Sequence, residues 1–206
     1  MGACVFALRP LHTLIEKHVL AAERLHGDDT TVPILAKGKT DTGRVWVYAR
    51  DDRPFNGPEP PAALFSASRD RSKAHPEAHL ASFSGILQAD AYGGYDGLYK
   101  PDRGPGVITQ ALCWAHARRK FFELTDIASN ARRGEGATPI SPIALEAVRR
   151  IDAIFDIERG VNGLDTDARL GVRQEQSAVL VADLESWMRS ERHRLSRKAP
   201  VAQAMD

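Results

Sequence analysis

Short runs of β-branched and aromatic residues, separated by turn-forming residues, dominate the first half of this chain. The clearest is RVWVYAR, Arg44–Arg50, in which valines and aromatic residues lie between polar ends, as in a half-buried strand. Further runs of this kind lie near Leu25 and at 62–69, 85–89 and 107–113. Helical spacing of apolar residues marks 8–23, and a shorter helix is expected at 75–83. This mixture predicts an α/β fold, with a mixed sheet and flanking helices.

The pattern changes after the last predicted strand, because apolar residues recur only at helical spacing from Trp114 onward. The segment ARRGEGATP, 131–139, is expected to be a linker. Ser141 as N-cap and Pro142 at the first helical position predict the start of a helix, which Asn162-Gly163 ends. A second, longer helix is expected over 166–195, with an apolar stripe formed by Leu180, Leu184, Trp187 and Met188.

Composition excludes several classes of protein. Of the 206 residues, 43% are hydrophobic and 27% are charged, which is enough apolar material for a packed core. The net charge of +1 does not indicate nucleic-acid binding, so any basic surface must be local. Two cysteines far apart in the sequence form no disulfide framework, and no run of apolar residues is long enough to span a membrane. We therefore expect a cytoplasmic protein.

Two aspartates lie where predicted strands end. Asp28 follows the strand near Leu25, and Asp90 follows the strand in GILQADAYGGY. Carboxylates on neighbouring strands can share a divalent cation, and Mg²⁺ prefers such oxygen ligands. Each residue also has an ordinary structural explanation, since Asp28-Asp29-Thr30 is a good turn and Asp90 could cap a following helix. Spacing alone leaves both interpretations open.

The segment CWAHARRKFF, 113–122, offers two more candidates. Cys113 and His116 have the spacing of half a zinc site, but no second pair lies nearby, so a buried cysteine and a helix-start histidine are the alternative. Arg118, Arg119 and Lys120 form a run of three cations that could contact phosphates of DNA. A solvated helix face explains the same run without any ligand.

Four segments in the same order resemble one known family. ERLHGDDTTVPIL, TGRVWVYARDDRPF, GILQADAYGGYDGLY and CWAHARRKFF are similar to the core of bacterial insertion-sequence transposases of the IS-sixty-six family, TnpC type. The resemblance extends from residue 8 to the end of the chain. It implies a ribonuclease H-like fold of the DDE class, with two aspartates and a glutamate that bind Mg²⁺ or Mn²⁺ for DNA strand cleavage and strand transfer.

The resemblance also assigns residues. Asp28 matches the first catalytic aspartate and metal ligand; Asp29 is the weaker choice, because the family often has Glu there. Asp90 matches the second. His116, Arg118, Arg119 and Lys120 match a C-x-x-H signature and the basic run after it, which implies contact with the DNA of transposon ends. The implied domains are an N-terminal helix leading into the core (1–24), a partial catalytic core (25–128) and a helical insertion (129–206) that is truncated at its C-terminal end.

One family motif is not found. The third acid of the family lies in an Asn-Asn-x-x-Glu-Arg context, which does not occur in these 206 residues. We therefore expect a transposase fragment that binds metal weakly and transfers no strands by itself. The alternatives are a non-catalytic remnant that binds DNA, associates with itself or a full-length transposase, and a product of a decayed gene with no selected function.

Overall fold

The computed structural model of the chain describes residues 2–125 and 140–206. The described chain forms two compact units. The first comprises the chain up to Arg53 together with Gly57–Cys113; the second comprises Pro54–Asn56 and the helices from Trp114 onward. The division between the units falls after Cys113. The expected end of the core at residue 128 and the expected linker at 131–139 lie outside the described residues. No described helix has the length and apolar character needed to cross a bilayer.

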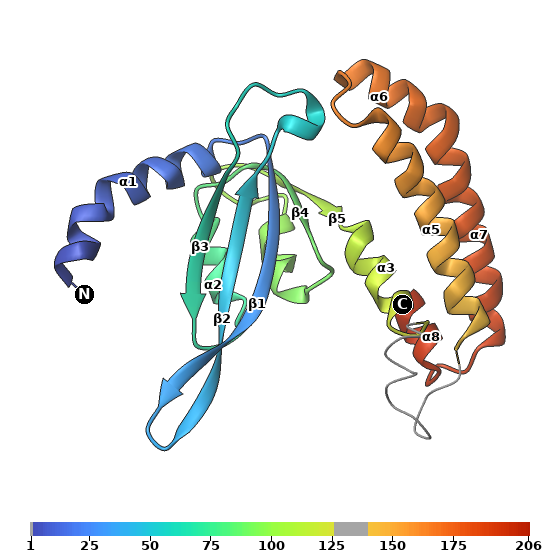
Figure 1. Cartoon of the computed structure of the whole chain (residues 1–206), viewed down its shortest axis with the longest axis horizontal. Coiled ribbons are helices and arrows are strands. Elements are labelled where there is room, and N and C mark those ends of the chain that lie inside the picture. The colour runs from blue at the N-terminus through green and yellow to red at the C-terminus, as the bar shows by residue number, and fades with distance from the viewer. Residues whose placement is uncertain (1, 126–139) are drawn as a thin grey trace. The chain divides into compact units, whose positions relative to one another are not determined.

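The first unit is built on a five-stranded sheet in the order β3-β2-β1-β4-β5 (Figure 1). Its strands β1 to β3 are antiparallel to one another, whereas β4 runs parallel to β1 and β5 parallel to β4. This is a mixed, ribonuclease H-like sheet, as the resemblance implies. The strands span Arg24–Ala36 (β1), Lys39–Arg50 (β2), Ala62–Ser68 (β3), Gly85–Ala89 (β4) and Ile108–Leu112 (β5).

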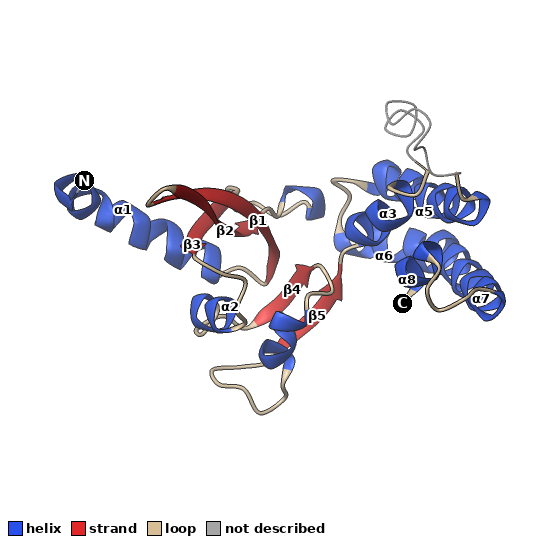
Figure 2. Cartoon of the chain, turned by 90° about the horizontal axis from the view of Figure 1, so that it is seen from below, coloured by secondary structure: helices blue, strands red, loops and turns tan. Residues whose placement is uncertain are grey.

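Three helical elements accompany the sheet, shown with it in Figure 2. The N-terminal helix α1, Gly2–Leu20, begins earlier than the expected 8–23 and contributes Val19 to the core. Between β3 and β4 lies the short α2, Ala74–His79, and after β4 the chain forms a 3-10 turn, η2, over Gly93–Tyr99. The expected helix after Asp90 is therefore this tight turn.

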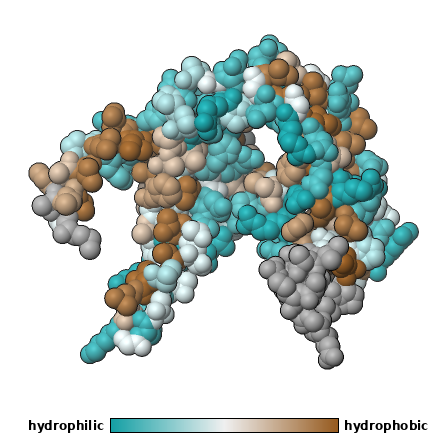
Figure 3. Space-filling model, viewed as in Figure 1, coloured by the Kyte–Doolittle hydropathy of each residue, from teal (hydrophilic) through white to brown (hydrophobic). Residues whose placement is uncertain are grey.

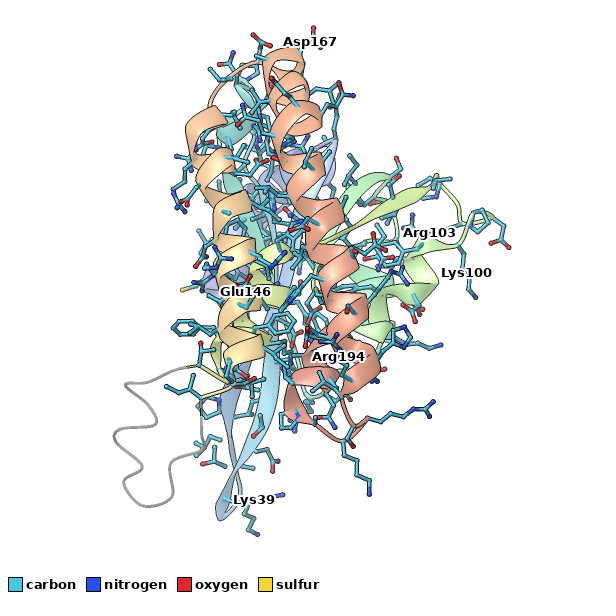
Figure 4. The ribbon with its side chains drawn as sticks, turned by 90° about the vertical axis from the view of Figure 1, so that its right-hand side faces the viewer. Lys39, Lys100, Arg103, Glu146, Asp167 and Arg194 are labelled. Atoms are coloured by element: carbon cyan, nitrogen blue, oxygen red, sulfur yellow. The ribbon has the colours of Figure 1, made fainter. Side chains whose placement is uncertain are left out.

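Strands β1 and β2 extend beyond the rest of the sheet as a two-stranded arm (Figure 1). Residues 30–36 of β1 pair only with β2, and a two-residue turn at Lys37-Gly38 joins the strands, with Gly38 at a φ of 70°. From the sequence, 32–35 is expected to be irregular and 36–44 to be a turn-rich loop. This expectation is wrong, because β1 continues to Ala36 and β2 begins at Lys39. Pro33 is tolerated because β1 has an open edge at this point. Leu35, near the tip, is 93% exposed, and Lys39 lies there too (Figure 4).

One face of the sheet carries the core of the first unit. Leu25 on β1, Trp46 and Tyr48 on β2 and Leu87 on β4 are fully buried. Aromatic rings from α2 and η2 pack on this face, among them His79 against Trp46 with ring centroids 6.2 Å apart. The opposite face is more open, since Phe65 of β3 is 62% exposed. Alternate residues of each strand therefore face either the buried core or the more open side of the sheet.

The second unit is a helical bundle. Its helices are α3 (Trp114–Phe122), α5 (Pro142–Val161), α6 (Thr166–Val172), α7 (Ala178–Arg194) and α8 (Pro200–Met205), with a π-helical turn over Arg173–Ser177 that joins α6 to α7. The predicted start of α5 is confirmed, because the hydroxyl of Ser141 accepts a hydrogen bond from the N–H of Ala144. The stripe of α7 packs on α5, with Leu184 1% exposed.

Candidate active site

Asp28 and Asp29 project from opposite faces of β1. Side chains alternate along a strand, and Leu25 and Gly27 mark the odd positions of β1 as buried. Asp29 pairs with Trp46 and therefore lies on the core face, whereas Asp28 pairs with Val47 and lies on the open face. The Asp29 side chain is only 1% exposed, while Asp28 is exposed. Contrary to expectation, Asp28 lies within the strand and not at its end.

Asp90 follows the last residue of β4, next to β1. The residue pairs of these parallel strands run from Arg24 with Ile86 to His26 with Gln88. When this register is continued by two residues, Asp28 comes level with Asp90. Asp90 also has a local structural role, since its Oδ1 accepts a hydrogen bond of 3.2 Å from the N–H of Tyr92. Asp90 thus follows a strand end as expected, but it does not cap the helical turn after it, because the N-cap residue of η2 is Tyr92 and no side chain caps it.

Two arginines neutralise the buried carboxylate of Asp29. Arg44 of β2 donates from Nη1 to Oδ2 at 2.7 Å, and Arg71 donates from Nε to Oδ1 at 2.9 Å. Arg71 comes from the loop between β3 and α2, and its Nη2 also donates to Oδ2 of Asp90 at 3.1 Å. Arg71 therefore links the carboxylates of β1 and β4 through one guanidinium group.

Aromatic side chains complete the surroundings of this network. The guanidinium of Arg71 lies over the ring of Tyr92, 3.9 Å from its centroid, and the Tyr92 hydroxyl donates to the carbonyl of Arg71. Burial, followed by the charges of neighbours that include Asp90 and Asp29, raises the pKa of Tyr95 far above its ordinary value. Burial and the charge of Asp90 raise the pKa of Tyr99 to about 12. Both phenols therefore remain neutral donors and acceptors.

The residues present fit a hydrated hard cation. The buried hydroxyls of Tyr95 and Tyr99 have no hydrogen-bond partner among the described residues, and such atoms are usually satisfied by ordered water. Mg²⁺ keeps several of its waters and takes only one or two carboxylates from a protein, which Asp28 and Asp90 can supply. Within 2–125 and 140–206, no cluster of three or more potential metal ligands is present. The same finding gives no support to zinc at Cys113 and His116.

The basic run on α3 divides into two kinds of residue. Arg118 forms a bidentate pair with Asp152 of α5, with Nε–Oδ1 and Nη2–Oδ2 distances of 2.6 and 3.0 Å. The hydrogen bonds of this pair lower the pKa of Asp152. Arg119 and Lys120 are exposed, whereas His116 is half-buried. Arg119 and Lys120 are thus the two cations of the run that are exposed and have no carboxylate partner among the described residues.

Sequence reasoning missed the arginines of the site. Nothing in the pattern of a loop reveals that Arg71 reaches Asp29, 42 positions earlier, and Asp90, 19 positions later. The burial of Asp29 could have been found, because Leu25 and Gly27 already define its face by alternation. Arg44 could also have been found once β1 and β2 were recognised as one hairpin.

A ribonuclease H-like sheet with aspartates on its adjacent parallel strands is the framework of the DDE class that the sequence resembles. A comparison with family profiles agrees: the profile described as "Transposase IS66 family" matches residues 1–206. The chain therefore belongs to the IS66 family of transposases and lies in its DDE region.

Curated relatives come from Sinorhizobium fredii. The "Uncharacterized protein y4hP" is 54% identical over 207 residues, which cover all of this chain and 38% of the relative. The "Uncharacterized protein y4qI" is 36% identical and is covered over 37% of its length. A third, "Uncharacterized protein y4jD", is 32% identical in a match that covers 96% of this chain and 37% of the length of the relative. The chain thus spans less than two-fifths of the relatives that it matches.

Proposed function

We propose that this chain contributes two metal-binding carboxylates, Asp28 and Asp90, to the core of a transposase that cuts and joins DNA. The observation that carries the proposal is that Asp28 lies on β1 and Asp90 directly follows β4, the adjacent parallel strand of a ribonuclease H-like sheet. Membership of the IS66 family supports DNA as the substrate. Mg²⁺ or Mn²⁺ bound there would polarise a phosphodiester oxygen and lower the pKa of a water molecule.

The residues around these carboxylates have separate tasks in this proposal. Asp28 presents its oxygens on the open face, where a phosphodiester can approach. The N–H of Tyr92 orients Asp90. The neutral hydroxyls of Tyr95 and Tyr99 offer hydrogen bonds to water beside Asp90. Asp29 is held by Arg44 and Arg71, so its role is to keep both guanidinium groups in place.

Calorimetric titration of the purified chain with MnCl₂ tests the proposal. We expect weak binding that Asp90→Asn and Asp28→Asn abolish, because each removes a charged ligand. Asp102→Asn is the control, since it removes an exposed carboxylate of the first unit that is no proposed ligand. Equal loss of Mn²⁺ binding in all three variants would point to unspecific electrostatics, and undiminished binding in Asp28→Asn would remove that residue from the site.

A second candidate is a DNA-binding role that needs no catalysis, supported by the exposed Arg119 and Lys120 on α3. Binding through phosphates makes the logarithm of affinity fall linearly with the logarithm of salt concentration. Substituting both residues by alanine should reduce the magnitude of that slope by about 1 for each lost contact. This slope can be measured by fluorescence anisotropy of a labelled DNA duplex over a range of NaCl concentrations.

Arg118→Ala is the control for that experiment. Its charge is already matched by Asp152, so the salt slope should stay close to that of the wild type. Equal slopes for the wild type and the Arg119/Lys120 variant would contradict a DNA-binding role of α3.

A further inference from the structure

The guanidinium of Arg71 is held from several sides. It donates to Oδ1 of Asp29 from Nε at 2.9 Å and lies 2.8 Å from the same oxygen through Nη2. Nη2 also reaches Oδ2 of Asp90 at 3.1 Å, and the ring of Tyr92 covers the plane of the group. A long side chain with this many contacts is fixed in position, although 34% of its surface remains exposed.

The two carboxylates that Arg71 joins differ in the number of cations that they contact. Asp29 receives Arg71 and Arg44, one at each oxygen. At Asp90, Oδ1 accepts from Tyr92 and Oδ2 from Arg71. Arg71 is therefore the one cation described at Asp90. Burial alone would lower the pKa of Arg71, but the hydrogen bonds and charges of Asp29 and Asp90 outweigh it and raise the pKa, so the group stays charged.

We propose that Arg71 is a positioning residue which occupies the place of a cation at Asp90 and competes with a divalent metal for this carboxylate. In the metal-free protein it bridges Asp90 to Asp29. When Asp28 and Asp90 bind a metal, the contact between Nη2 and Asp90 breaks while the contact with Asp29 remains. The inference rests on the proposed function, because it requires Asp90 to be a metal ligand.

If Arg71 competes with the metal, substitution of Arg71 by a neutral residue should raise the affinity for a divalent cation. Two cations that share one carboxylate repel each other, so removal of the guanidinium charge strengthens divalent binding. Arg71→Gln should therefore bind Mn²⁺ more tightly than the wild type, by roughly tenfold, in the range of coupling between two ligands. Arg71→Lys keeps a charge but lacks the planar guanidinium that bridges two carboxylates. Its Mn²⁺ affinity should therefore lie between those of the wild type and Arg71→Gln.

Arg44→Gln is the matched control. It removes the other guanidinium from Asp29, and Arg44 has no described contact with Asp90. Titration calorimetry with MnCl₂ should show a clearly smaller rise in affinity for Arg44→Gln than for Arg71→Gln. Equal rises would show that only the net charge matters, and an unchanged or weaker affinity in Arg71→Gln would overturn the proposal.

A measurement on the wild-type chain makes the test independent of variants that fail to fold. The Nε–H group of Arg71, protected by Asp29, gives an NMR signal that Arg71→Lys identifies by its loss. Titration with diamagnetic Mg²⁺ should shift this signal along a saturating curve. A signal that stays fixed while Mg²⁺ shifts the Asp90 amide would overturn the proposal.

The outcomes also separate this inference from the proposed function. If neither the wild type nor Arg71→Gln binds Mn²⁺, the metal site itself is wrong and the inference falls with it. A different result would leave the metal site intact and contradict only the competition by Arg71. In that result the wild type and Arg71→Gln bind Mn²⁺ equally well, and Asp90→Asn does not bind it.

Discussion

Asp28 and Asp29 are neighbours in the sequence, but they lie on different faces of the sheet. Asp29 belongs to the interior, where its 1% exposed side chain meets two guanidinium groups. Asp28 is exposed on the opposite face, and the resemblance implies that it is the first catalytic aspartate. A carboxylate that is buried and doubly paired is suited to holding its partners, whereas an exposed one can take a new ligand.

This difference predicts opposite effects on stability. Asp29→Asn leaves Arg44 and Arg71 without their shared partner, and loss of one member of a buried ion pair should lower the free energy of unfolding by about 3 kcal/mol. Asp28→Asn, at an exposed position, should change it little. Urea denaturation followed by tryptophan fluorescence compares the two. Similar stabilities for both variants would contradict the assignment of Asp29 to the interior.

At the scale of elements, strands with one buried face were predictable, whereas the arm was not. The segments 44–50 and 85–89 show β-branched residues because one face of each packs on the core. No residue of 30–43 belongs to the hydrophobic core, so these residues need no strict alternation of apolar and polar residues and show none. Pro33 and the polar segment after it then resemble a loop. Pairing between the two strands holds the arm in the structure.

Helix α5 depends on ion pairs that acid should weaken. Hydrogen bonds with Arg149 lower the pKa of Glu146 to about 2, and those with Arg173 lower the pKa of Glu158. Because the pKa is lower in the folded state, the stabilisation is present above the ordinary carboxyl pKa of about 4 and is lost as pH falls through the lower, folded value. Figure 4 shows Glu146 on α5, one of these carboxylates.

We therefore expect the melting temperature, measured by circular dichroism at 222 nm, to fall between about pH 5 and pH 2.5. Glu158→Gln should show a smaller fall than the wild type, because one of the titrating pairs is already absent. These pairs are partly exposed, so 1 M NaCl should also reduce the effect. An identical pH dependence in the wild type and the variant would exclude the Glu158 pair as a cause.

At the scale of the whole chain, two compact units and a set of exposed apolar residues stand out. Besides the arm, α1 exposes Phe6 to 74% and Leu14 to 65%, and apolar surface is visible on α1 in Figure 3. The sequence predicted a strand close to each of the five observed ones, whereas the assignment of Asp28 and Asp90 as catalytic acids stays a prediction. It could not predict Arg71, because contacts between a loop and distant strands leave no periodic signal.

Catalysis by this chain alone is not expected. A DDE centre requires three acids, and no third metal ligand lies beside Asp28 and Asp90 among the described residues. Incubation with supercoiled plasmid and Mn²⁺ should therefore give no nicked product above that of Asp90→Asn. Nicking that Asp90→Asn abolishes would show that two carboxylates suffice or that the described residues omit the third.

The alternation along β1 has a consequence for how this gene can vary. Three added nucleotides between codons 25 and 28 insert one residue and leave the frame intact, a change that most surface loops accept. If the pairing of the residues before the insertion is kept, Asp28 would move to the position opposite Trp46 on the core face, and Asp29 to the next position on the open face. Alternatively, the strand would accommodate the extra residue as a bulge. A length change in this strand therefore exchanges the buried and the exposed acid, although neither aspartate codon is altered.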